Sequence, residues 1–206
     1  MSLARIVDAF DGVTELPIEI PEVQDVVQRL GIQDEIVCVP VDGDPSKCRG
    51  VFYQFTKRDG VYGEPILVTL VVYSANLDTR WQRVICTKEI IHVTDAQAEK
   101  THTSEEVDGL VEKLLGPLST EDYGLADLQA AIDKLAMYQA LIILFPDAAR
   151  EEALQQVAAG VRTVEQVAEW ASLPLPLVKF ALMDDWPEIK KELVGLGAFA
   201  HEKAAE

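Results

Sequence analysis

The first part of the chain combines short helical patterns with apolar runs that are typical of strands. Helices are predicted over 3–10 and over 22–30, because Pro21 can open the second helix and Gly31 can end it. Asp59-Gly60 favours a hairpin loop, since glycine accepts a positive φ. We expect a small antiparallel sheet from three runs rich in Val, Ile, Tyr and Phe, at 35–41, 50–56 and 65–73.

From residue 79 onward the apolar spacing becomes helical. Thr103 and Glu106 form a possible capping box at the start of an amphipathic helix, which Gly116-Pro117 ends. Further helices are predicted over 79–93, where we expect partial burial, and over 125–144, 148–159, 163–172, 176–184 and 187–194, with a frayed tail after residue 197. The fold class is therefore α+β, with a main domain over 1–146 and a helical C-terminal subdomain over 147–206 that packs on it.

Charge and hydropathy exclude several classes of function. The chain of 206 residues carries a formal net charge of −17, which disfavours contact with the phosphates of nucleic acid. Its longest apolar run, 140–145, is far shorter than the roughly 20 residues that span a bilayer. The N-terminal residues do not have the pattern of a secretion signal. We therefore expect a cytoplasmic protein without a membrane or nucleic-acid partner. Its three cysteines, Cys38, Cys48 and Cys86, are interpreted as reduced structural thiols.

One helical segment carries a candidate site. It reads Lys88-Glu89-Ile90-Ile91-His92, with Arg83 five residues before Lys88 and Asn76 after the preceding strand. This segment resembles the ImmA/IrrE family of zinc metallopeptidases, in which an HExxH helix supplies two zinc ligands and a general base. The resemblance implies a zincin-like domain. It places Glu89 where the general base stands and His92 where the second metal ligand stands, and Lys88 replaces the first ligand.

The lysine changes the expected chemistry. A protonated amine has no lone pair to donate and repels a divalent cation, so zinc affinity should be lost. We expect Lys88 to replace the charge of the metal by pairing with Glu89 or a nearby carboxylate. The alternative is that Lys88 and His92 are solvated neighbours on an exposed turn of helix. No cofactor is expected, and zinc would be required only if the protein is active.

The family has a third ligand, a glutamate, on a following helix, and two registers are open. In the first register this ligand is Glu106, and the closing element is 114–117. In the second register, which we prefer, Ala136 and Ala140 match the family pattern, residues 143–146 close it, and the ligand position falls on Leu135. Neither register supplies three ligands. His102 and His201 are interpreted as surface histidines.

The pattern over 163–182 has the outline of a helix-turn-helix, but Lys179 is the only basic residue on its second helix, so two packed structural helices are favoured. Three hypotheses for function remain. The first is a metallopeptidase-like protein without catalysis that acts by protein binding, in bacterial or phage regulation as the resemblance implies. The second is an active zinc peptidase that uses His92, Glu89, Glu106 and a further ligand. The third is a structural or oligomeric subunit.

Overall fold

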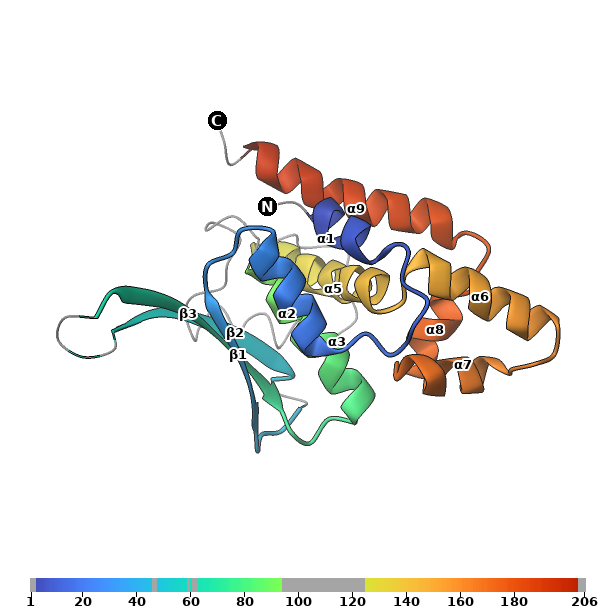
Figure 1. The fold of residues 1–206 in the computed structure, drawn as a ribbon, viewed down its shortest axis with the longest axis horizontal. Helices are drawn as coiled ribbons and strands as arrows, with labels where there is room; N and C mark the ends of the chain where they lie inside the picture. Colours follow the sequence, from blue (N-terminus) through green and yellow to red (C-terminus); the bar gives the residue numbers. More distant parts are fainter. Residues whose placement is uncertain (1–2, 46–47, 59, 61–62, 94–124, 204–206) are drawn as a thin grey trace.

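The computed structural model describes residues 3–45, 48–58, 60, 63–93 and 125–203, and within α5 and α9 it describes the side chains of 135–144 and 186–195 (Figure 1). The elements are α1 (Leu3–Phe10), α2 (Ile20–Arg29), β1 (Glu35–Val41), β2 (Gly50–Arg58), β3 (Pro65–Ser74), α3 (Thr79–His92), α5 (Leu125–Leu144), α6 (Asp147–Ala158), α7 (Val164–Ala171), α8 (Leu175–Ala181) and α9 (Trp186–Lys203). The α+β class is confirmed.

The sheet is mixed, with the strand order β1-β3-β2. β2 and β3 form an antiparallel hairpin, and Gly60 in its loop has φ +80° as expected. β1 runs parallel to β3, so the prediction of a wholly antiparallel sheet is wrong for this pair. The long apolar run of β3 suits a central strand, whereas Pro40 of β1 cannot donate a ladder hydrogen bond and suits an edge. Both features agree with the position of β3 between β1 and β2.

α3 occupies the centre of the molecule. It packs against β2 and β3 on one side and against α2 and α5 on others. All nine residues from Arg83 to Ile91 are buried, so the helix is more enclosed than the partial burial that we expected. A helix surrounded on all sides is usually apolar, yet this stretch includes Arg83, Thr87, Lys88 and Glu89. The polar residues of α3 therefore need partners inside the protein.

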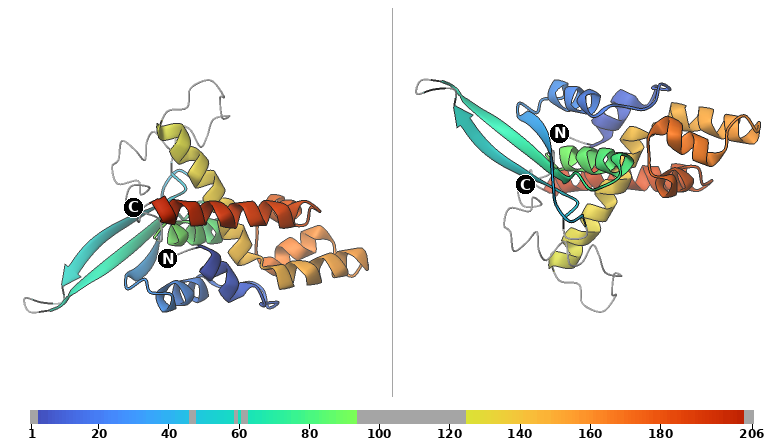
Figure 2. Two further views of the ribbon diagram at one scale, coloured as in Figure 1. Left: turned by 90° about the horizontal axis from the view of Figure 1, so that it is seen from above. Right: turned by 90° about the horizontal axis from the view of Figure 1, so that it is seen from below.

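The C-terminal helices complete the core. α9 runs across α1 and α5 (Figure 2), and the helix reaches Lys203, beyond the end that we expected near residue 194. Arg150 of α6 donates to the carbonyl oxygens of Ala181 (2.6 Å) and Met183 (3.0 Å), and thereby caps the end of α8. These contacts bind the C-terminal helices to one another and to α1. In the described part of the chain, every helix is too short or too polar to cross a membrane.

Candidate functional site

The candidate site lies on the second half of α3. Asp78 caps the start of this helix, because its carboxylate accepts a hydrogen bond from the backbone of Arg80 at 2.9 Å. Lys88 and Glu89 lie in the buried stretch, and His92 is the last helical residue. Since Lys88 and His92 are four residues apart, they share one face of the helix. The helix thus presents the motif in the order that the sequence predicted.

Lys88 and Glu89 form a buried ion pair. Lys88 Nζ lies 2.7 Å from Glu89 Oε1, and only 5% and 4% of the two side chains are exposed. Among the described residues no aligned hydrogen bond reaches Glu89 Oε1, so charge attraction dominates this contact. The pairing expected from the sequence is therefore present, and the alternative of an exposed, solvated turn is wrong.

Strand β2 covers the site. A Cβ atom on Gly50 would lie 2.2 Å from Ile85 Cγ2 and 3.2 Å from Glu89 Oε1, so the lack of a side chain allows this close approach. Two residues further along, the ring of Phe52 stacks on the ring of His92 with centroids 6.3 Å apart and an interplanar angle of 18°. The start of β2 therefore closes over both Glu89 and His92.

Two other residues of the motif hold the scaffold together. Arg83 Nη1 lies 2.8 Å from Glu19 Oε2, and Arg83 Nη2 donates to the carbonyl oxygen of Ile18, so this arginine anchors the segment before α2 onto α3. Asn76 donates to Asp42 Oδ1 at 2.9 Å and to the carbonyl oxygen of Gly43 at 3.1 Å. Both contacts stabilise the connections around the sheet and account for these residues without a catalytic role.

The two registers for the third ligand are tested unequally. α5, the helix of the second register, packs directly on α3, with Ala136 and Ala140 buried and Leu135 half-buried against the core. The closing residues 143–145 are also buried. Glu106 and His102 lie outside the described residues, as does the predicted helix that contains Glu106, and nothing is described of the side chain of His201. The choice between the registers therefore stays a prediction.

The described residues do not fit a zinc ion. An ammonium group stands at the first ligand position and is paired with the carboxylate that would act as general base. In the described part of the chain, no group of three His, Cys, Asp or Glu side chains is placed to hold a metal. The chemistry of this pair is thus charge neutralisation inside the core.

A pair of cysteines was not found from the sequence. Cys38 of β1 and Cys86 of α3 are close enough for their thiols to share a hydrogen bond, although they are far apart in the chain. A hydrogen bond with the Cys86 thiol is the largest cause of the lowered pKa of Cys38. The side-chain amide of Gln24, whose Nε2 lies 3.3 Å from Cys38 Sγ, lowers this pKa further. Their spacing carries no motif. Alternation along β1 gives the one available signal, because it directs Cys38 to the same face as the buried Ile36.

The helix-turn-helix outline is formed by α7 and α8. Thr163 and Gln166 make a reciprocal capping box at the start of α7, and Ser172 ends the helix in the left-handed conformation with φ 50°. Lys179 of α8 pairs with Glu165 at 3.9 Å, and both side chains are largely exposed. Phe180 packs edge-on against the buried Trp186, with centroids 5.6 Å apart. These contacts agree with two structural helices.

The fold and site define a mixed α+β chain with a buried lysine–glutamate pair on its central helix. No protein-family profile, no curated protein and no solved structure matches the chain.

Proposed function

We propose that this chain is a metallopeptidase-like protein that has lost zinc binding and catalysis and acts by binding another protein. The observation that carries the proposal is the buried ion pair of Lys88 and Glu89, at 2.7 Å. In the arrangement implied by the resemblance to ImmA/IrrE peptidases, these positions would hold a zinc ligand and the general base. A lysine ammonium brings positive charge to the same place without a lone pair, and so removes the need for a metal.

The surroundings of Glu89 also argue against catalysis. A general base must reach a water molecule that attacks the substrate, through a hydrogen bond of about 2.6–3.2 Å. Here one carboxylate oxygen faces Lys88 Nζ, and the start of β2 at Gly50 lies against that same oxygen. With only 4% of its side chain exposed, Glu89 has little access to water. We therefore expect no peptide hydrolysis.

Metal content tests the loss of the site. The full chain is purified without chelators or a metal-binding tag, and zinc is measured by elemental analysis before and after zinc is added and excess removed. We expect no bound metal in the wild type and a gain of zinc affinity in Lys88→His, which restores an imidazole one turn from His92. Lys191→His is the matched control, because it adds a histidine at an exposed lysine of α9.

The outcomes separate the hypotheses. Near-stoichiometric zinc in the wild type would overturn the proposal and favour the active peptidase that uses His92, Glu89 and Glu106. Failure of Lys88→His to bind more zinc than Lys191→His would show that the geometry of a zinc site is not retained. In that case the loss of catalysis would stand, but the relation to metallopeptidases would not.

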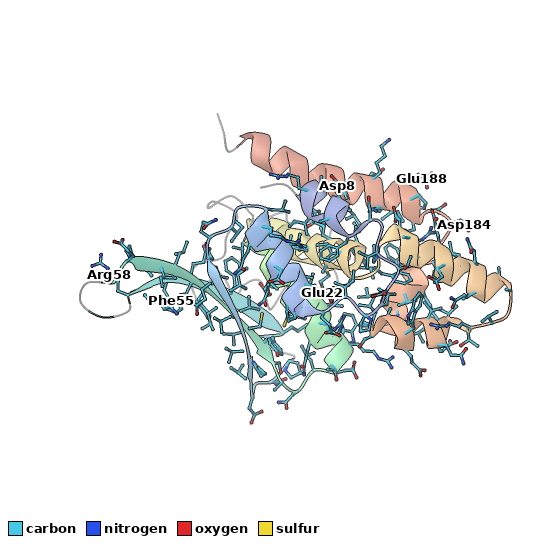
Figure 3. The ribbon with its side chains drawn as sticks, viewed as in Figure 1. Asp8, Glu22, Phe55, Arg58, Asp184 and Glu188 are labelled. Atoms are coloured by element: carbon cyan, nitrogen blue, oxygen red, sulfur yellow. The ribbon has the colours of Figure 1, made fainter. Side chains whose placement is uncertain are left out.

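The surface of the β2–β3 hairpin supports a role in binding. This hairpin extends away from the helices (Figure 1), and large apolar residues are exposed on both of its faces. Tyr53 (52%) and Phe55 (47%) lie on one face, and Leu67 (42%), which pairs with Thr56, lies on the other. Phe55 and Arg58 lie on the hairpin, away from Asp8, Glu22, Asp184 and Glu188 on the helical part (Figure 3). On the sheet, Lys57 of β2 pairs with Glu35 of β1 at 2.6 Å. Exposed aromatic side chains are enriched at protein interfaces. The resemblance suggests bacterial or phage regulation as the setting.

The same surface favours one other function, that of an oligomeric subunit. Sedimentation velocity over a range of concentrations distinguishes the two. A monomer at all concentrations would argue against the subunit, whereas an assembly that Phe55→Ser disrupts would favour it. Thr56→Ser is the matched control, because Thr56 is an exposed residue of the same strand.

A further inference from the structure

The pair of Cys38 and Cys86 joins the sheet to the central helix. Cys38 lies in the middle of β1, opposite Val71 of β3, which is fully buried. Directly paired residues point to the same face of a sheet, so Cys38 faces the side on which α3 packs. Cys86 lies on α3 with 3% exposure, and its thiol and that of Cys38 share a hydrogen bond. The two sulfur atoms therefore meet where the sheet packs on α3.

The surroundings make the two sulfur atoms unequal. Cys38 is half-buried and accepts a hydrogen bond from Gln24 Nε2 at 3.3 Å, in addition to the contact with Cys86. These donors stabilise a thiolate, which is the form of cysteine that reacts. The hydrogen bond to Cys38 and burial raise the pKa of Cys86, which keeps this thiol protonated. Cys38 is thus the more reactive and more accessible member, with a buried thiol beside it.

We propose that Cys38 and Cys86 are a peroxide-reactive thiol pair that closes into a disulfide between β1 and α3. In the first step the Cys38 thiolate attacks one oxygen of a hydroperoxide, a S–O bond forms, and the O–O bond breaks. The product is a sulfenic acid, and the leaving oxygen takes up a proton to become water or an alcohol. The sulfur loses two electrons and the peroxide gains them.

The second step consumes the neighbouring thiol. Cys86 gives up its proton and attacks the sulfenic sulfur of Cys38, a S–S bond forms, and the S–O bond breaks. The departing hydroxide combines with the proton to give water. The sum is two thiols and one hydroperoxide converted into one disulfide, one water and one water or alcohol. A cellular thiol reductant would reverse the change by thiol–disulfide exchange.

This reaction does not depend on the loss of zinc binding. A disulfide at Cys86 would fix α3 to β1 only two residues before Lys88, so that the candidate site and the sheet edge would move as one unit. Cys48 lies in the connection between β1 and β2, where the backbone amide of Cys48 donates to the carbonyl oxygen of Asp44. Cys48 is therefore the control cysteine, against which the reactivity of Cys38 and Cys86 is compared.

The test uses the reduced full chain, treated with a small excess of hydrogen peroxide and then with an alkylating reagent. The chain has three cysteines, so closure of the pair leaves one reactive thiol, and peptide mass spectrometry should find Cys38 linked to Cys86. Dithiothreitol should restore all three thiols. Cys48→Ser should behave like the wild type, with no reactive thiol left after oxidation.

Two variants identify the roles. In Cys86→Ser the sulfenic acid on Cys38 should persist and react with dimedone, whereas in Cys38→Ser neither a disulfide nor a dimedone adduct at Cys86 should form. The proposal is overturned if the wild type keeps three free thiols, if Cys48 is oxidised before Cys38, or if Cys38 proceeds to a sulfinic acid without linkage to Cys86. Circular dichroism of each reduced variant checks that it is folded before the reaction is measured.

Discussion

α3 and α9 each hold a lysine in an ion pair, and the carboxylate partners of the two lysines differ in their access to water. Lys88 and Glu89 are both buried, with side chains 5% and 4% exposed. Lys190 is 12% exposed, but its partners Asp11 and Asp147 remain 46% and 48% exposed. A fully desolvated pair leaves an uncompensated charge in the core when one partner is removed, whereas a half-hydrated carboxylate returns to water. The two lysines have similar N–O distances to their partners, but breaking the Lys88 pair should cost more free energy than breaking the Lys190 pairs.

The largest effect should come from Lys88→Met, which leaves Glu89 buried without this cation. We expect a loss of about 3–5 kcal/mol in the free energy of unfolding, the cost of breaking a buried ion pair from one side. Lys88→Met/Glu89→Leu removes both charges and should recover most of that loss. Urea unfolding measures both variants. If the single and double variants are equally unstable, the two charges are not coupled in the folded protein.

The next effect concerns the strand that covers the buried pair. Gly50→Ala would place a Cβ atom 2.2 Å from Ile85 Cγ2, so β2 or the helix must shift. We expect a loss of about 1–3 kcal/mol, as for other overpacked sites. Ile85→Ala removes the clashing atom, so the combined loss should be smaller than the sum of the single losses. Gly43→Ala has no atom within 4 Å of the new carbon and should be neutral, and an equal loss there would contradict the steric explanation.

The sequence predicted the regular elements better than the site. The apolar runs and periodic stripes located β1 and α5 at their observed ends, because burial of one face dictates those patterns locally. The parallel pairing of β1 with β3 was missed, although Pro40 marks an edge strand. Strand order depends on which surfaces meet after the chain folds back, and a local pattern does not record this.

The candidate site was predicted in part. The pairing of Lys88 with Glu89 was expected from chemistry, but neighbouring residues on a helix point in different directions, so periodicity could not establish it. Burial of the whole stretch from Arg83 to Ile91 bends the flexible lysine toward the carboxylate. The contact of Cys38 with Cys86 was missed because the two residues are distant in sequence. Both are also small and apolar in character, so neither stands out from the other core positions.

A smaller effect is expected at Lys190 of α9, whose carboxylate partners are half-exposed. Lys190 Nζ lies 3.0 Å from Asp11 Oδ1 and 2.6 Å from Asp147 Oδ2, and so joins α9 to the end of α1 and the start of α6. Lys190→Met should lower the free energy of unfolding by about 1–2 kcal/mol. The loss is smaller than for Lys88 because both carboxylate partners of Lys190 regain water. Lys191→Met changes an exposed neighbour and should have little effect. Equal losses in thermal or urea unfolding would show that the ion pairs contribute nothing measurable.

The smallest effect is the dependence of stability on alkaline pH. Burial alone would lower the pKa of Lys190, but the hydrogen bonds and negative charges of Asp147 and Asp11 outweigh it and raise this pKa. Between the unfolded pKa, about 10.4, and the raised folded pKa, the native state binds more protons than the unfolded state, so stability falls as pH rises. The contribution is fully present below the unfolded pKa and is lost as pH rises through the raised folded pKa.

The measurement is the difference in free energy of unfolding between the wild type and Lys190→Met, followed from neutral to strongly alkaline pH. Other groups, such as Cys38 and Tyr73, titrate in both proteins and cancel in this difference. The advantage of the wild type should shrink as pH passes the folded pKa of Lys190, while Lys191→Met stays parallel to the wild type. A constant difference would mean that the lysine stabilises α9 through the packing of its methylene groups and not through its charge.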